Sequence, residues 1–116
     1  FYQLEGDIVL KIIDKGVAKD IHIKEGDIYL LPSKVPHSPQ RGANTVGIVI
    51  EYPRSEGMED ALEWYCENCN HQLFRAPFIL SNIEADMPII FDQYYTNKDN
   101  CTCSQCGTTM KAPNKI

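Results

Sequence analysis

Two cysteine pairs in the second half of the chain carry the clearest chemical signal in the sequence. Cys66-Glu-Asn-Cys69 and Cys103-Ser-Gln-Cys106 each place two thiols across a short turn. Two such turns can set four thiolates at the corners of a tetrahedron, which is the arrangement that Zn(II) or a single iron ion takes with sulfur ligands. We therefore predict a metal site with Fe or Zn at these four cysteines. Because protein ligands fill it completely, we expect this site to be structural.

The residues after each pair agree with a metal site. Asn70 and Gly107 follow the second cysteine of each pair, and both residue types tolerate the left-handed backbone conformation that turns N–H groups toward sulfur. Unconnected buried cysteines and a redox dithiol remain alternatives, although no helix N-terminus is evident beside either pair to lower a thiol pKa. We expect the fifth cysteine, Cys101, to be a free thiol, while its Cys-x-Cys spacing to Cys103 would allow it to exchange into the site.

A second group of reactive side chains lies in the first half of the chain. In "LLPSKVPHSPQR" a histidine, His37, stands between two prolines and is followed by Arg41. Imidazole is a common metal ligand, and a planar guanidinium can bind a carboxylate through two parallel hydrogen bonds. Glu51 ends the run "TVGIVIE", where the period of two puts it on one strand face with Gly47, and this glycine would leave room beside Glu51 for a ring.

Each of these three residues also has an ordinary interpretation. The histidine can be a loop residue satisfied by water or by a backbone carbonyl. Arg41 can be a surface arginine in a turn, and Glu51 an edge-strand carboxylate that faces water, because most charged side chains are exposed.

The elements that must position these residues are short strands. From Phe1 to Tyr52 the runs "FYQLE", "IVLKII", "AKDIHI", "IYLL" and "TVGIVIEY" are rich in β-branched and aromatic residues, with Gly and Asp between them. This pattern predicts a mainly β fold, an antiparallel sandwich or barrel, with a Pro-rich loop before the last run. His22 alternates with Ile21 and Ile23, so we expect it on the solvent face.

A polar break at Pro53–Glu59 separates this part from the rest, because Pro and Gly interrupt strand pairing. We expect one domain over residues 1–52 and a small extension over 60–116. In the extension a short strand should follow the first cysteine pair. The run "SNIEADMPIIFDQYYTN" predicts a helix with Ser81 or Asn82 as N-cap, which Pro88 either interrupts or begins.

Composition narrows the class of protein. The chain has 116 residues, 43% of them apolar and 23% charged, and a formal net charge of −5. No apolar run approaches the roughly 20 residues of a membrane span, and no basic stripe offers a phosphate-binding surface, so we expect neither a membrane nor a nucleic-acid partner. The sequence opens at Phe1 inside a predicted strand, without an initiator Met or a signal-peptide pattern, which suggests a fragment. Paired cysteines of the metal-binding type favour a cytoplasmic location.

The spacing of certain glycine, proline and histidine residues in the first half of the chain resembles that of a known protein family. The spacing of Gly26, Pro32 and His37 resembles the second motif of the cupin superfamily, in which a histidine points into a small β-barrel; the usual Gly and Asn are replaced by Lys34 and Arg41. Gly6 matches the glycine that closes the first cupin motif. The resemblance therefore puts the other two ligands of a two-histidine, one-carboxylate iron site before Phe1.

Over essentially all 116 residues, "FYQLEGD", "LLPSKVPHSPQR" and the paired cysteines resemble the microbial 3-hydroxyanthranilate 3,4-dioxygenase family. The resemblance implies a cupin (double-stranded β-helix, jelly-roll) barrel with a rubredoxin-like four-cysteine region and a short helix. It also implies extradiol cleavage of 3-hydroxyanthranilate by O2 to 2-amino-3-carboxymuconate semialdehyde, on the kynurenine route to quinolinate and NAD. A mononuclear Fe(II) and a homodimer belong to the same expectation.

The resemblance also implies roles for single residues. His37 would ligate the catalytic iron, Arg41 would bind the substrate carboxylate, and Glu51 would contact the amino and hydroxyl edge and accept a proton. Two other hypotheses are another cupin oxygenase or isomerase, and a non-catalytic cupin binding module with a structural zinc ribbon. The presence of one iron ligand in this sequence is compatible with the binding module.

Overall fold

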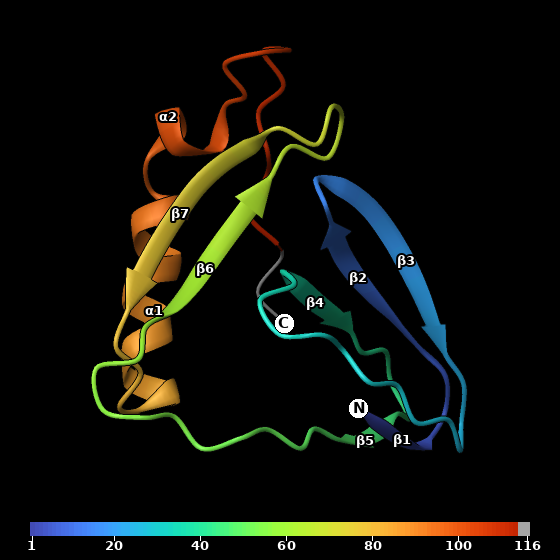
Figure 1. Ribbon diagram of the computed structural model, residues 1–116. Helices are drawn as coiled ribbons and strands as arrows, with labels where there is room; N and C mark the ends of the chain where they lie inside the picture. The colour runs from blue at the N-terminus through green and yellow to red at the C-terminus, as the bar shows by residue number, and fades with distance from the viewer. Residues whose placement is uncertain (114–116) are drawn as a thin grey trace. The chain divides into compact units, whose positions relative to one another are not determined.

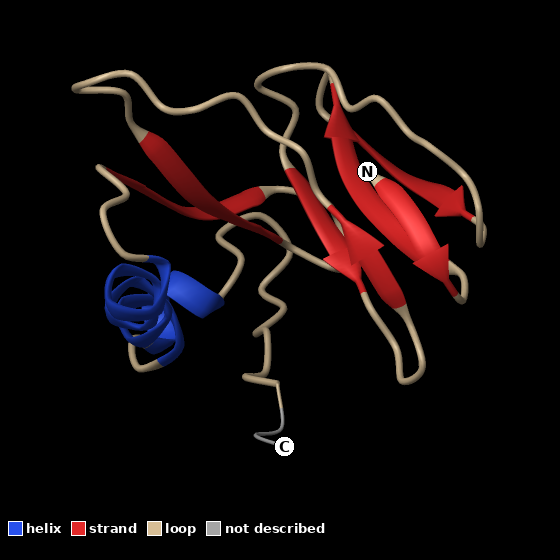
Figure 2. Cartoon of the chain, turned by 90° about the horizontal axis from the view of Figure 1, so that it is seen from below, coloured by secondary structure: helices blue, strands red, loops and turns tan. Residues whose placement is uncertain are grey.

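The computed structural model describes residues 1–113 of the chain. The last three residues of the expected 60–116 extension therefore lie outside the described residues. The structure is mainly β, and it divides after Pro53 into two compact units, Phe1–Pro53 and Arg54–Ile116. Figures 1 and 2 show the strands and helices of each unit. Among residues 1–113, neither helix is long and apolar enough to cross a membrane.

The first unit consists of short antiparallel strands. They are β1 (Tyr2–Glu5), β2 (Ile8–Asp14), β3 (Val17–Ile23), β4 (His37–Gln40) and β5 (Val46–Ile48). In one sheet β2 lies between β3 and β4, and in a second sheet β1 pairs with β5. The strands "FYQLE", "IVLKII" and "AKDIHI" are thus confirmed.

Alternation along β2 builds the core of this unit. Ile8, Leu10 and Ile12 are buried on one face, while Lys11 between them is exposed. Ile23 of β3 completes the buried cluster, and partly buried apolar side chains pack against it: Phe1, Ile21, Tyr29, Leu31 and Val35. Residues directly opposite each other in antiparallel strands share a face. Partners of the buried β2 residues consequently lie on the same face of the sheet, although Lys19 and His37, the partners of Ile12, are exposed.

In the first unit two predicted strands are shorter than expected, and one strand was missed. Ile28 of "IYLL" forms a single bridge to Tyr2, and the strand in "TVGIVIEY" ends at Ile48. The interpretation of the segment around His37 as a loop was wrong, because β4 pairs with β2. A proline within a strand argues for a loop only in the middle of a sheet, and Pro39 lies on an edge strand.

The described strands do not close the expected jelly-roll barrel. They form separate sheets of three and two strands in the first unit, with β3 and β4 at the edges of the larger sheet. A closed barrel requires every strand to have a partner on both sides. The mainly β class is therefore confirmed, whereas the closed barrel is not present within residues 1–113.

The second unit joins a hairpin to a helix through an aromatic core. Strands β6 (Asp60–Tyr65) and β7 (Gln72–Phe78) pair antiparallel, and α1 (Ile83–Tyr95) and α2 (Lys98–Cys101) follow them. Trp64 of β6, a strand that the sequence pattern did not predict, stacks on Tyr94 of α1 with ring centroids 4.4 Å apart. Phe74 and Phe91 lie 5.8 and 5.9 Å from the same indole ring. These ring contacts place α1 against the hairpin.

The start of α1 follows the sequence prediction, but its proline does not. The Asn82 side chain accepts hydrogen bonds from the N–H groups of Glu84 and Ala85, so Asn82 is the N-cap. Backbone N–H groups of Asn82 and Ser81 donate to the Asp86 carboxylate and hold its pKa below the ordinary value. Pro88 lies inside the helix. Packing of the helix on the aromatic core offsets the one backbone hydrogen bond that a proline removes.

Gly6 after β1 provides a test of the first unit. Its φ is +67°, and an added Cβ would lie 2.7 Å from the Asn44 carbonyl oxygen. Gly16, with φ +78°, has open space at the same position. We expect Gly16→Ala to lower the free energy of unfolding by about 1 kcal/mol through backbone strain alone. Gly6→Ala should lower it by at least about 1 kcal/mol more through the collision, and equal losses in urea titrations would contradict this.

Candidate functional site

The four paired cysteines converge in the second unit. Their Sγ atoms all lie within 4.8 Å of one another, and the Cys66–Cys106 and Cys69–Cys103 distances are both 3.5 Å. Metal–sulfur bonds of about 2.3 Å at a tetrahedral ion require sulfurs about 3.8 Å apart. The cysteines are free thiols rather than disulfides. The donor set and its spacing therefore fit a zinc or iron ion.

Both cysteine turns have the same backbone geometry. Asn70 and Gly107 have φ of 65° and 75°, which confirms the predicted left-handed conformation. Their N–H groups donate to the carbonyls of Cys66 and Cys103, at 2.8 and 2.9 Å. In each turn the N–H of the first cysteine donates to the carbonyl five residues further along, at 2.8 Å. The two turns thus present their sulfurs in equivalent ways.

The thiols of this cluster differ in their pKa values. Hydrogen bonds with the side chains of Thr108 and Asn68 lower the pKa of Cys106 to about 5. The backbone N–H of His71 lowers the pKa of Cys69, but loss of solvation and hydrogen bonds with the other three cysteines outweigh it and raise this pKa to about 12. Four sulfurs at this distance retain protons among them, and a bound cation would replace those protons.

Two residues beside the cluster have other roles. The buried thiol of Cys101 donates to the Tyr94 carbonyl at 3.0 Å, and Cys101 lies outside the group of four. His71, which the sequence analysis did not single out, has its Nε2 3.4 Å from the Ser104 hydroxyl. This contact joins the first cysteine turn to the second. The position of this histidine, two residues after a cysteine pair, was the sequence signal that could have identified it.

His37 lies on the face of β4 that it shares with Ile12 of β2. It is paired directly with buried Ile12, and its ring meets the Phe1 ring edge-on with centroids 5.9 Å apart. Its Nδ1 lies 2.9 Å from the Val35 carbonyl oxygen. Because a carbonyl only accepts hydrogen bonds, the proton of the neutral ring is on Nδ1, and Nε2 presents its lone pair. The side chain is exposed, so this lone pair suits a metal ligand oriented by a backbone carbonyl.

Arg41 is brought to the same face through β1. Its Nη1 donates to Oε1 of Gln3 at 3.3 Å. Phe1 and Gln3 are two residues apart on an extended chain, so their side chains share a face. Since Phe1 contacts His37 and Gln3 contacts Arg41, we infer that the imidazole and the guanidinium lie toward one face of the first unit.

Gly47 lies beneath the Arg41 guanidinium. It is paired with Gln3, and an added Cβ would lie 2.6 Å from Arg41 Nη1 and 2.7 Å from Gln3 Oε1. We predicted that the missing side chain would leave room for a ring beside Glu51. The structure instead fills that room with the guanidinium of Arg41.

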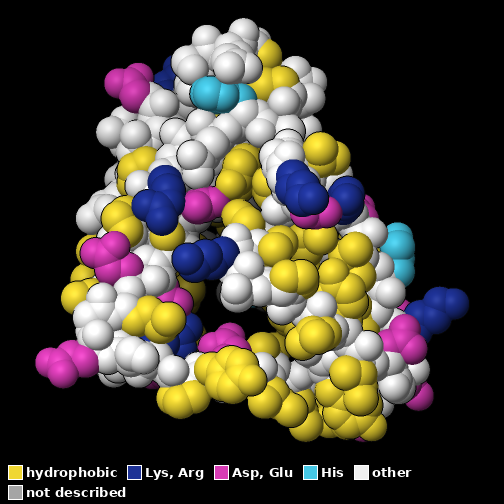
Figure 3. Space-filling view, in the orientation of Figure 1, with side chains coloured by type: hydrophobic (Ala, Val, Ile, Leu, Met, Phe, Trp, Pro, Cys, Tyr) yellow, Lys and Arg dark blue, Asp and Glu magenta, His cyan; other side chains and the backbone are white. Residues whose placement is uncertain are grey.

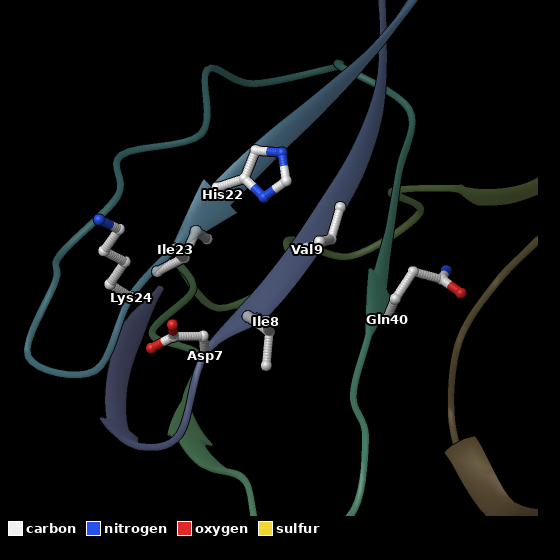
Figure 4. A pocket seen from close by; sticks show the side chains of 7 residues that line it. All are labelled: Asp7, Ile8, Val9, His22, Ile23, Lys24 and Gln40. Carbon is white, nitrogen blue, oxygen red and sulfur yellow. The ribbon is translucent and has the colours of Figure 1, made fainter.

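Glu51 and His22 are both exposed side chains of the first unit. Glu51 is exposed, three residues beyond the end of β5, so the alternation that grouped it with Gly47 does not extend to it. His22 is exposed on the outer face of β3, which confirms its predicted position. Figure 4 shows His22, Val9 and Gln40 on three adjacent strands, where Val9 lies in the middle and is paired with both of the others.

The cysteine cluster predicts a difference between two matched substitutions. Cys103→Ser should lower the metal bound per chain well below one, and it should lower the melting temperature of the second unit, because metal binding is coupled to folding. Cys101→Ser should retain the metal. Elemental analysis and thermal unfolding would measure both effects. Unchanged metal content and stability in Cys103→Ser would contradict a metal site here.

Comparison with known proteins places these features in a family. The family model described as 3-hydroxyanthranilic acid dioxygenase matches residues 1–95. A 3-hydroxyanthranilate 3,4-dioxygenase of Xanthomonas euvesicatoria pv. vesicatoria is 53% identical over 115 residues, which cover 99% of this chain and 65% of that protein. The protein of that name from Xanthomonas oryzae pv. oryzae is 54% identical with the same coverage.

A more distant relative agrees. The 3-hydroxyanthranilate 3,4-dioxygenase of Shewanella woodyi is 48% identical over 108 residues, 92% of this chain and 57% of that protein. The chain thus spans somewhat less than two thirds of the length of these curated relatives. From the matched residues and these identities, the chain belongs to the 3-hydroxyanthranilic acid dioxygenase family.

Proposed function

We propose that the protein containing this chain is an Fe(II)-dependent dioxygenase that cleaves the ring of 3-hydroxyanthranilate with O2 and yields 2-amino-3-carboxymuconate semialdehyde. The observation that carries the proposal is the pair of contacts that join His37 to Phe1 and Arg41 to Gln3, two residues apart. A metal-ligand lone pair and a carboxylate-binding guanidinium on one face match a substrate that is both a metal chelator and an acid. Family membership and the names of the relatives support the same reaction.

The residues of this chain fit part of a catalytic iron site. Two histidines and one carboxylate leave open positions on Fe(II) for substrate and O2, and the Nε2 lone pair of His37 would supply one ligand. Within residues 1–113, the grouped metal ligands are the four cysteines. In this proposal the other two iron ligands precede Phe1, as the family resemblance implies. Bound iron supplies the redox chemistry, whereas the protein supplies orientation and charge.

Arg41 and Glu51 would orient the substrate from opposite edges. The Arg41 side chain is exposed while its Nη1 is held by Gln3, so its other N–H donors can receive a carboxylate in a bidentate fork. Glu51 would accept the hydroxyl proton of the substrate as a general base. Arg41 would thus bind the substrate, and Glu51 would accept its proton.

Further parts of the proposal concern the whole protein. We propose that residues 1–52 are part of a cupin barrel, and that residues 60–116 form a rubredoxin-like extension holding Fe or Zn at Cys66, Cys69, Cys103 and Cys106. We also propose that the protein forms a homodimer and that it is located in the cytoplasm. The family resemblance supports the barrel and the dimer, and the paired free thiols support the reducing compartment.

Arg41→Lys tests the substrate assignment in the full-length protein loaded with Fe(II). Lysine keeps the charge but loses the bidentate fork. We expect KM for 3-hydroxyanthranilate to rise about tenfold to a hundredfold, the scale of hydrogen bonds to a charged group, as measured by O2 uptake. Arg75→Lys, at a surface ion pair with Glu63, is the matched control. Absence of O2 uptake by the wild-type protein, with substrate bound, would instead indicate a binding module.

Glu51→Gln tests the proton acceptor. If Glu51 accepts the hydroxyl proton, kcat should fall about 10²- to 10⁴-fold. Stopped-flow formation of the ring-opened product, followed over a range of pH, would measure this loss. Near-normal turnover at every pH would remove Glu51 from the mechanism.

A further inference from the structure

We infer that Gln3 is a positioning residue, which holds the Arg41 guanidinium in place with a neutral acceptor and so makes the site selective for ring ligands that carry a carboxylate. The inference rests on the proposed function, because it concerns the same site. It goes beyond it by naming a residue that touches neither metal nor substrate. Three features of the structure carry it.

The first feature is the fixed orientation of the Gln3 amide. The Gln3 side chain is 1% exposed, and its Nε2 donates to the Glu5 carbonyl at 2.9 Å. A carbonyl cannot donate, so the NH₂ group must lie on the Glu5 side. The oxygen Oε1 is therefore directed to Arg41 Nη1. A buried amide with both ends satisfied resists rotation, because turning it would leave two polar groups unpaired.

The second feature is the shape of the cradle. Gly47 is paired with Gln3, and both Nη atoms of Arg41 lie within 3.2 Å of the position that a Gly47 Cβ would occupy. The guanidinium therefore rests on bare backbone on one side and on the Gln3 oxygen on another. A larger side chain at position 47 would displace either the guanidinium or the amide.

The third feature is charge. Among the residues that the structure describes, the partner of Arg41 is the neutral amide of Gln3 rather than a carboxylate. An acceptor without charge orients the guanidinium and leaves its positive charge for an anionic ligand. A glutamate at position 3 would pair with the guanidinium but would neutralise it, and it would lose the hydrogen bond to the Glu5 carbonyl. This contrast separates positioning from simple packing.

The test compares two ring ligands that differ by the carboxylate alone. The full-length protein is titrated without O2 against 3-hydroxyanthranilate and against 2-aminophenol, and Kd is measured by calorimetry. Gln3→Leu should raise Kd for 3-hydroxyanthranilate about tenfold, the scale of one hydrogen bond to a charged group, and change Kd for 2-aminophenol less than about twofold. Gln40→Leu, the same substitution on the exposed face of β4, should change neither.

Gln3→Glu keeps the inference falsifiable if Gln3→Leu does not fold. It should lower the affinity for 3-hydroxyanthranilate at least tenfold, because the new carboxylate neutralises the charge of Arg41, and it should change Kd for 2-aminophenol less than about twofold. Equal losses for both ligands, or full affinity in Gln3→Glu, would overturn the inference. The inference is supported if the wild-type protein prefers the ligand with the carboxylate and the Gln3→Leu variant loses that preference. This result would hold even if the protein consumed no O2. Absence of O2 consumption would reject only the proposed reaction.

Discussion

Ile8, Leu10 and Ile12 lie on one face of β2, and their removal from water fixes the register of both neighbouring strands. A shift of one residue would turn these side chains to solvent and would turn His37, which is paired with Ile12, to the outer face. The position of the imidazole therefore depends on hydrophobic burial in a neighbouring strand. The same register pairs Gln40 with Val9, while a local contact keeps the Val35 carbonyl beside the histidine ring.

The second unit is stabilised in a different way from the first. Its hairpin and helix share a small aromatic core around Trp64 and Tyr94, and the thiols gather where both turns repeat one hydrogen-bond pattern. Backbone conformation prepares the four sulfurs before any ion binds. Bringing thiolates together without a cation is unfavourable, so the energetic contribution of this cluster depends on a metal in a way that the isoleucine core of the first unit does not.

Local rules predicted much of the structure, and tertiary contacts decided the rest. The left-handed Asn70 and the N-cap at Asn82 follow from residue type and were predicted. Pro88 inside α1 and the strand at His37 were not, because each is stabilised by partners distant in sequence. Gln3 was missed for a related reason: alternation in "FYQLE" favours burying Tyr2 and Leu4, yet both are 38% exposed. Figure 3 shows hydrophobic side chains at the surface over β1 and β5.

The spacing of the two cysteine turns has a topological consequence. Cys69 and Cys103 are 34 residues apart, and β7, α1 and α2 all lie between them. A tetrahedral ion would close this segment into a ring, as a disulfide does, and restrict the unfolded chain by an amount on the order of 3–4 kcal/mol. A protease that cut the connection between β7 and α1 would then leave two fragments tethered through sulfur, separable by a chelator but not by a reductant.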